Sequence, residues 1–199
     1  MKDLAILLGA LACITQVYGY WIYNKAIYKG DIKPNATSWG LWGLGSAVAY
    51  WSYTRLDNGW IEDMLPLVCA VICFGTFAMA LIKGKFEKAK REDILIGALD
   101  IMVIAFWLSS KSDVATNVWM QIDVVISFLP ILRDSWRKPQ DEQLKPWIVW
   151  CVAYTLMFAS VLLVMIEEGK AGWSLMYPSV YFVLHLAVAL VVKFRTAKP

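Results

Sequence analysis

Seven apolar runs of near membrane-spanning length most constrain how this chain can fold. A bilayer core of about 30 Å is crossed by about 20 helical residues. In lipid every backbone N–H and C=O must be satisfied within the segment, so runs of this length are predicted to be helices. A mean hydropathy of +0.54 and an apolar content of 59% agree with this reading. The runs cover residues 4–24, 38–55, 62–82, 94–110, 115–132, 146–166 and 173–194.

The basic residues predict how these helices are oriented. With the N-terminus outside, the inside regions 25–37, 83–93, 133–145 and the tail after residue 192 hold 15 Lys and Arg, whereas the outside regions hold four. Basic residues favour the cytoplasmic side of a membrane. We therefore expect a multi-pass protein of the inner (plasma) membrane with its N-terminus out and its C-terminus in. The basic residues flank spans and form no single stripe, so nucleic acid is not an expected partner.

One pattern occurs twice along the chain. The segments Ser38–Trp42 and Pro146–Trp150 both contain Trp-x-x-Trp, follow a basic stretch and lie 108 residues apart. The same shift places the first two runs on the fifth and sixth, and it places the third on the seventh with a slip of about four residues in an outside loop, whereas the fourth run has no counterpart. The sequence thus predicts an all-α membrane protein with seven transmembrane helices, in which two parallel three-helix bundles (1–83 and 113–199) are joined by a linker helix within 84–112.

The repeated tryptophans lie at the inside ends of their runs. Trp39 and Trp42, like Trp147 and Trp150, are three residues apart, so each pair shares one helix face. Tryptophan is enriched at membrane interfaces. We expect these four residues to be interfacial anchors, with a gate or shared packing as the alternative.

Several motifs resemble a family of transporters. Ser127–Pro130 followed by Arg133 resembles the Pro-containing helix and cytoplasmic loop of the SWEET, PQ-loop and PnuC superfamily, and Ala49–Tyr53 resembles its Leu-Trp-x-x-Tyr motif. The segment Pro34–Trp42 and the Asp-x₆-Pro of Asp123–Pro130 are similar to those of small bacterial seven-helix membrane proteins.

This resemblance implies a fold and a function. It implies alternating-access transport of a small polar or ring-shaped solute, facilitated or proton-coupled, with Pro130 as a hinge. It also implies that Trp51 stacks on the solute and that Cys73 and His185 stand where the family has a pocket asparagine. Receptors that bind a ligand without transport share the scaffold and are the alternative. Dimers or trimers are common in such families, which makes a homo-oligomer compatible with this chain.

Polar residues inside the apolar runs are the other candidates for a solute site. A charge at the bilayer centre costs at least about 2.5–3.5 kcal/mol, so Asp123 is expected to face the bundle interior. Ser127 lies on the same helix face as Asp123. Gln16 lies in the inner half of the first run, and His185, the only histidine, lies in the middle of the last. A structural role, through packing or hydrogen bonds between helices, is the competing hypothesis for each.

No motif for enzymatic chemistry is found. The chain contains no Walker loop, dinucleotide fingerprint or His-Glu-x-x-His motif. We expect no catalytic residues, metal or cofactor, and the partners are the solute and the lipid bilayer. A membrane enzyme would require Asp123 and His185 to lie within hydrogen-bond distance of each other or of a substrate.

Overall fold

The chain folds into a bundle of long helices. The computed structural model describes residues 1–55, 60–83, 89–110, 113–169 and 172–196. Within these residues the elements are α1 (Lys2–Lys29), α2 (Ala36–Arg55), α3 (Trp60–Lys83), α4 (Arg91–Ser109), α5 (Asp113–Arg137), the 3₁₀ helix η1 (Pro139–Asp141), α6 (Leu144–Glu168), the 3₁₀ helix η2 (Gly172–Leu175) and α7 (Met176–Thr196). The predicted bundle boundaries at 83/84 and 112/113 border segments outside the described residues.

Local signals define several helix ends. Gly30, with a φ of 80°, ends α1, and Gly169, with a φ of 65°, ends α6. Both have the left-handed conformation that glycine adopts without a steric penalty. At the start of α2, the Asn35 side chain accepts a hydrogen bond from the backbone N–H of Ser38 at 2.9 Å, which caps the helix.

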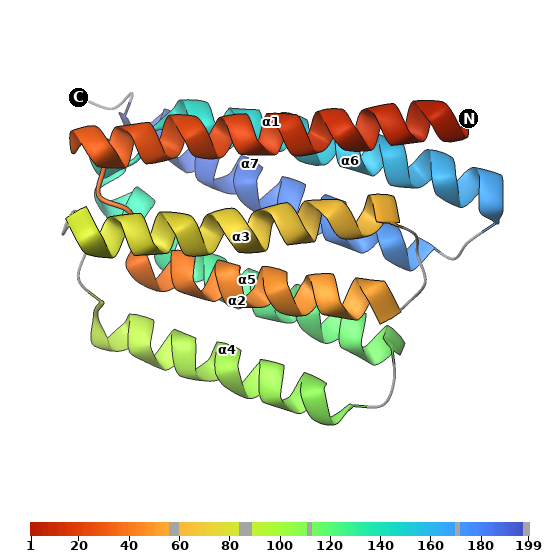
Figure 1. Cartoon of the computed structure of the whole chain (residues 1–199). Coiled ribbons are helices and arrows are strands. Elements are labelled where there is room, and N and C mark those ends of the chain that lie inside the picture. The colour runs from red at the N-terminus through yellow and green to blue at the C-terminus, as the bar shows by residue number, and fades with distance from the viewer. Residues whose placement is uncertain (56–59, 84–88, 111–112, 170–171, 197–199) are drawn as a thin grey trace.

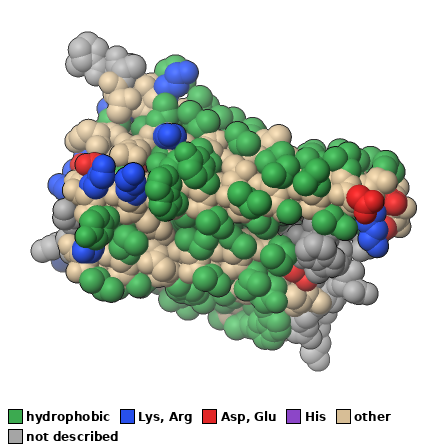
Figure 2. Space-filling model, turned by 45° about the horizontal axis from the view of Figure 1, so that its top comes forward, with side chains coloured by type: hydrophobic (Ala, Val, Ile, Leu, Met, Phe, Trp, Pro, Cys, Tyr) green, Lys and Arg blue, Asp and Glu red, His purple; other side chains and the backbone are tan. Residues whose placement is uncertain are grey.

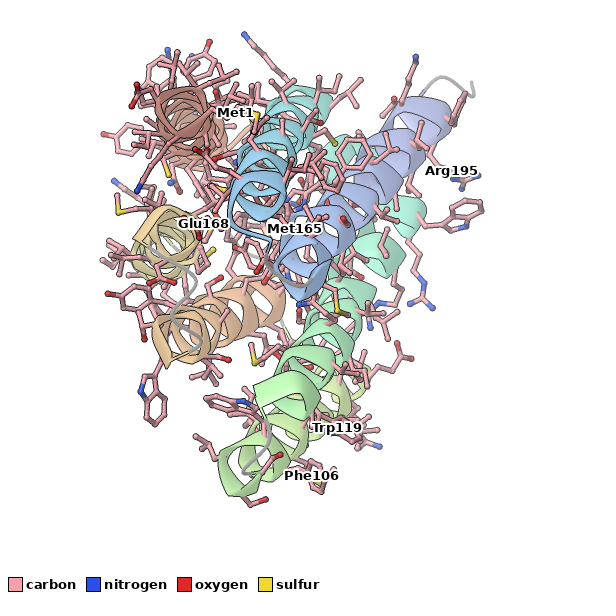
Figure 3. The ribbon with its side chains drawn as sticks, turned by 90° about the vertical axis from the view of Figure 1, so that its right-hand side faces the viewer. Met1, Phe106, Trp119, Met165, Glu168 and Arg195 are labelled. Atoms are coloured by element: carbon pink, nitrogen blue, oxygen red, sulfur yellow. The ribbon has the colours of Figure 1, made fainter. Side chains whose placement is uncertain are left out.

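The helices form two layers that face each other. Seen along the bundle, α1, α3 and α2 lie in one layer and α6, α7 and α5 in the other (Figure 3). α3 contacts both α1 and α2, and α7 contacts both α5 and α6. The layers meet through α1 with α6 and through α2 with α5, and α4 packs at the edge against α5 and α2 (Figure 1).

The surface is apolar along the bundle and charged at its ends. Successive helices run in opposite directions (Figure 1), so the basic stretches after α1, before α4, after α5 and at the end of α7 gather at one end, which we call the basic end. On the face drawn in Figure 2, hydrophobic side chains cover the length of the bundle. This distribution is compatible with a bundle embedded in lipid.

Four of the described helices are long and apolar enough to cross a membrane. They are Lys2–Lys29, Asp63–Lys83, Leu144–Glu168 and Met176–Thr196. The helices α2, α4 and α5 have 20, 19 and 25 residues, so their length suffices, but their composition differs from that of the four. Small, aromatic and hydroxyl residues lower the hydropathy of α2, and charged and amide residues lower that of α5. α4 is as apolar as α1 and α7 but carries more charged residues for its length.

The four repeated tryptophans are core residues, so their expected role as interfacial anchors is wrong. Trp147 is 0% exposed, Trp39 and Trp150 are 1% exposed, and Trp42 is 6% exposed. Their rings contact one another between the two layers, with centroids 6.0 Å apart for Trp39 and Trp150 and 6.1 Å apart for Trp42 and Trp147. The reason is that each pair faces the other layer rather than lipid.

Close contact between α1 and α6 depends on one glycine. A Cβ atom added to Gly19 would lie 2.4 Å from Nε1 of Trp150, which is closer than real contacts allow. The same Nε1 donates a hydrogen bond to the backbone oxygen of Gln16 at 3.3 Å. Gly19 therefore lets the Trp150 indole approach the α1 backbone closely.

Candidate functional site

A buried polar cluster joins three helices at the interface between the layers. Gln16 of α1 is 0% exposed, and its Nε2 donates to the Cys69 sulfur of α3 at 3.3 Å and to the Tyr154 hydroxyl of α6 at 3.5 Å. The Cys69 sulfur lies 3.7 Å from the same hydroxyl. The Oε1 of Gln16 is buried and has no hydrogen-bond partner within the described residues. Since buried acceptors are nearly always satisfied, this atom is available to a ligand or a water molecule.

Tyrosine hydroxyls extend the cluster along α1 and α7. The Tyr20 hydroxyl lies 3.0 Å from the Cys73 sulfur. Cys69 also interacts with the hydroxyls of Tyr20 and Tyr177. The thiol of Cys69 is thus surrounded by hydroxyl and amide groups from α1, α6 and α7, an arrangement suited to hydrogen bonding and not to metal coordination. Among the described residues, no group of three or more His, Cys, Asp and Glu side chains can hold a metal ion.

His185 lies in an aromatic cage beside this cluster. Its ring centroid is 4.9 Å from Tyr154, 5.1 Å from Phe128 and 5.5 Å from Trp147. Its Nδ1 lies 2.7 Å from the backbone oxygen of Tyr181, so a neutral ring donates from Nδ1 and leaves Nε2 as an acceptor. No hydrogen bond joins His185 to Asp123 in the described part of the chain. Within the described residues the two side chains therefore form no direct acid–base pair.

Asp123 lies on the α5 side of the same interface. It is 2% exposed, and its Oδ1 has no hydrogen-bond partner among the residues described. Tyr181 of α7 and Asp100 of α4 both lie within electrostatic range of its carboxyl. Ser127 is also buried, but its hydroxyl donates to the backbone oxygen of Val124 at 2.8 Å. Ser127 is therefore occupied by its own helix.

Two other predicted residues are placed differently. Trp51 is 50% exposed and packs edge-on against Trp107 of α4, with ring centroids 5.8 Å apart. It lies apart from the Cys69 cluster. Pro130 is buried inside α5, which continues as an α-helix to Arg137. A role as a hinge remains a prediction.

The structure thus brings Gln16, Cys73 and His185 into one cluster, with Asp123 at its border. Sequence reasoning did not identify Cys69, whose thiol lies at the centre of the cluster. In the sequence alone this residue resembles any small buried residue. The spacing that could have found it is i, i+4: the pairs Cys69 and Cys73, Gln16 and Tyr20, and Tyr181 and His185 each lie one turn apart on a shared face.

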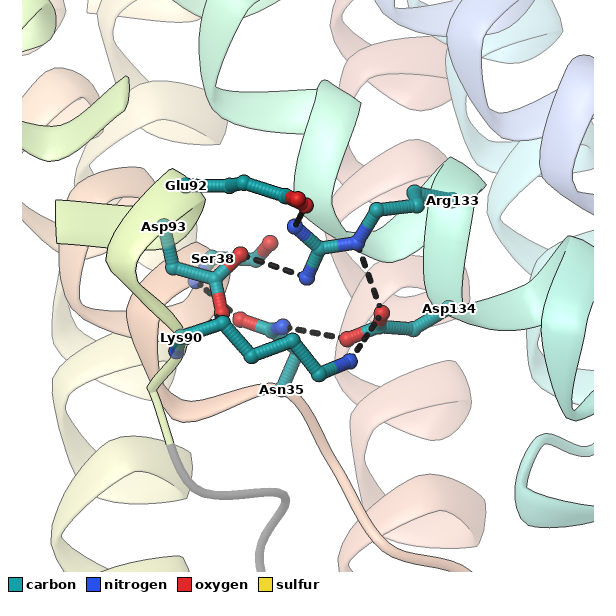
Figure 4. Close-up of polar contacts among 7 residues, drawn as sticks. All are labelled: Asn35, Ser38, Lys90, Glu92, Asp93, Arg133 and Asp134. Carbon is teal, nitrogen blue, oxygen red and sulfur yellow. Dashed lines mark hydrogen bonds and ion pairs between the residues drawn. The ribbon is translucent and has the colours of Figure 1, made fainter. Parts of the chain in front are cut away.

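An ion-pair network closes the basic end beside α4 and α5. Arg133 of α5 pairs with Glu92 and Asp93 at the start of α4 and with its neighbour Asp134 (Figure 4). Asp134 also accepts hydrogen bonds from Lys90 at 2.9 Å and from Asn35, before α2, at 2.8 Å. Asp93 is 0% exposed, so this pair is shielded from solvent. The network holds together the starts of α2 and α4 and the end of α5.

A buried glutamate closes the basic end beside α1 and α6. Glu142 is 7% exposed and accepts hydrogen bonds from the Tyr23 hydroxyl at 2.8 Å and from Nε1 of Trp147 at 3.1 Å. Burial raises the pKa of the Glu142 carboxyl to about 7, although these two hydrogen bonds favour its charged form.

Two cavities lie near these groups. The first, at the basic end, has a volume of about 10 Å³ and is lined by Asn35, Asp134 and Glu142 among others. A cavity of this size holds about one water molecule, so a solute does not fit. The second is an apolar groove of about 310 Å³ between α6 and α7, lined by Tyr154, Phe158 and Phe182 among others.

Comparisons with protein-family models, with curated proteins and with solved structures found no match to this chain. The candidate site therefore rests on its own geometry.

Proposed function

We propose that this protein is a seven-helix membrane transporter that moves a small polar or ring-shaped solute by alternating access, either facilitated or coupled to protons. The observation that most supports this proposal is the Oε1 atom of Gln16. It is buried where helices of both layers meet, and it has no hydrogen-bond partner among the described residues. A hydrogen-bonding group walled by aromatic rings suits a solute that offers both polar atoms and a flat face.

The helix arrangement supports two parallel repeats. In each layer the third helix in chain order packs between the first two, and the layers meet through equivalent tryptophan pairs. At 1.5 Å per residue, even the 19 residues of α4 extend about 28 Å, close to the thickness of the hydrocarbon core. These observations favour seven spans in the three-one-three order of SWEET-like transporters.

The closed basic end supports alternating access. The Glu142 contacts join α1 to α6, and the Arg133 ion pairs join α4 to α5. Both sets lie between the cluster and the cytoplasmic side in the proposed orientation. A transporter in this conformation is closed to the inside, and breaking these contacts would open the path.

A ligand screen tests this proposal. Purified protein is melted with sugars, vitamins and nucleosides, and uptake of any stabilising compound is then measured in proteoliposomes. We expect one class to raise the melting temperature of the wild type and of Gln140→Leu, in which the same substitution is made at an exposed position. Gln16→Leu should lose the response.

The outcomes separate the hypotheses. Saturable uptake that Gln16→Leu abolishes supports transport. Tight binding without uptake indicates the receptor alternative and refutes transport. A stabilising ligand that acts equally on Gln16→Leu moves the site away from the Cys69 cluster.

A further inference from the structure

Two buried acidic side chains lie about halfway along two helices that pack against each other. Asp100 is the middle residue of α4, and Asp123 lies two residues from the middle of α5. At 1.5 Å per residue, Asp100 is about 14 Å from either end of its helix. In the proposed membrane orientation, both carboxyls therefore lie near the bilayer midplane.

Among the residues that the structure describes, neither carboxyl is balanced by a positive charge. Asp100 is 1% exposed, and in this part of the chain both of its carboxyl oxygens lack hydrogen-bond partners, as does Oδ1 of Asp123. No Lys or Arg of the described residues pairs with either of them. The two carboxyls are within electrostatic range of each other, so ionising both would place two repelling charges in an apolar region.

The surrounding helices leave space for this pair. A Cβ atom on Gly45 of α2 would lie 3.1 Å from Oδ2 of Asp123, so glycine keeps α2 clear of the carboxyl. The adjacent Ser46 hydrogen-bonds with Tyr181 of α7, whose hydroxyl is the other titratable group that faces Asp123. Helices of both proposed repeats and the helix between them therefore meet at this pair.

We propose that Asp100 and Asp123 form a proton-binding site that holds a proton on at least one of its two carboxyls, and that release of this proton is the step coupled to transport. The coupling half of this inference rests on the proposed function, and the proton-binding half does not. A proton suits this pair better than a metal ion, which needs several more oxygen ligands than two carboxyls supply.

The site can be tested without knowing the solute. Wild-type protein is reconstituted in lipid nanodiscs, and infrared difference spectra are recorded between mildly acidic buffer, in which solvent-exposed aspartates are already ionised, and alkaline buffer. Labelling with ¹³C-aspartate shifts the carboxyl bands of Asp and leaves those of Glu142 in place. We expect an aspartic acid C=O band that disappears at alkaline pH.

Variants assign the band to the pair. Asp100→Asn and Asp123→Asn should each remove or displace it, whereas Asp63→Asn, which changes a half-buried aspartate near the opposite end of the bundle from the basic end, should leave it unchanged. If the pair variants do not fold, the labelled wild type and Asp63→Asn still give the test. Absence of the band, a band that ignores pH, or a band that responds to Na⁺ at constant pH would each overturn the proposal.

Failure of this inference can be told apart from failure of transport. If the Asp band is missing and a pH gradient does not drive solute uptake, the proton site is refuted, and facilitated transport remains supported. A titrating Asp band in a protein that moves no solute keeps the proton site and removes its role in transport.

Discussion

Replacing Glu142 by Gln should change how the stability of this protein depends on pH. Glu142 is buried where the loop before α6 meets α1, and its two carboxylate oxygens accept hydrogen bonds from Tyr23 and Trp147. Glutamine fills the same volume and does not titrate. The comparison between the two proteins therefore isolates the ionisation of one carboxyl.

The magnitude follows from the pKa. Burial raises the pKa of Glu142 from its ordinary value of 4.5 to about 7. A difference of about 2.5 pKa units, at about 1.4 kcal/mol each, corresponds to about 3–4 kcal/mol. Because the pKa is raised in the folded state, the protonated carboxyl stabilises the fold: this contribution is complete below pH 4.5 and is lost as the pH rises through about 7.

Thermal unfolding in nanodiscs between about pH 4 and about pH 9 measures this effect. The melting temperature of the wild type minus that of Glu142→Gln should fall by about 6–16 °C across this range, at about 2–4 °C per kcal/mol. The test is how this difference in melting temperature changes with pH. The amide also changes the hydrogen bonds of the side chain, which shifts the difference at every pH. Asp31→Asn, at an exposed position, should keep the wild-type slope. A difference that is flat, or that rises with pH, would refute the reasoning.

Two further substitutions test packing and charge, both measured by thermal unfolding. Gly19→Ala should destabilise the bundle by about 1–3 kcal/mol, because its methyl group would overlap the Trp150 ring. Gly75 has open space around it, so Gly75→Ala should be neutral or stabilising. Equal effects of the two substitutions would contradict the close contact at Gly19. Arg133→Met should lower the free energy of unfolding by about 3–5 kcal/mol, because it leaves the buried Asp93 carboxylate without its Arg133 partner. Removing the charges of both Arg133 and Asp93 should restore most of that stability. No recovery in the double variant would show that this ion pair is not the cause.

The helices were largely predictable because they depend on local properties. Runs of apolar residues set where each helix lies, and the predicted segment 4–24 falls within the longer α1. The helices extend beyond the predicted runs into polar residues, since an α-helix need not end where the hydrocarbon does. α5, for example, reaches Arg137, five residues past the predicted 132. Hydropathy indicates how much of a chain lies in lipid more reliably than it indicates where a helix ends.

The tryptophan pairs were misread because the same local pattern fits two positions. An aromatic residue near the end of an apolar run can face lipid at the interface or face another helix. Trp39 and Trp136 illustrate this, since the first is 1% exposed and the second 56% exposed. The repeat was the better signal: residues duplicated at equivalent positions of two bundles meet when those bundles pack against each other.

The polar contacts of the site could not be predicted because they join distant parts of the chain. Gln16 and Tyr154 are 138 positions apart, and nothing near either residue specifies the other. The same limit applies to Asp100, because its surroundings depend on how α4 packs in the bundle. Its helix is at the edge of the bundle, but its carboxyl faces Asp123 because α4 packs on α5 through that side. An acidic residue on an edge helix has only two places to avoid lipid, the headgroup region or the neighbouring helix. Asp100 is too far from either end of α4 to reach the first. Counting residues to both helix ends would therefore have placed it inside the bundle, and the buried acidic residue of the adjacent helix would then have been its expected neighbour.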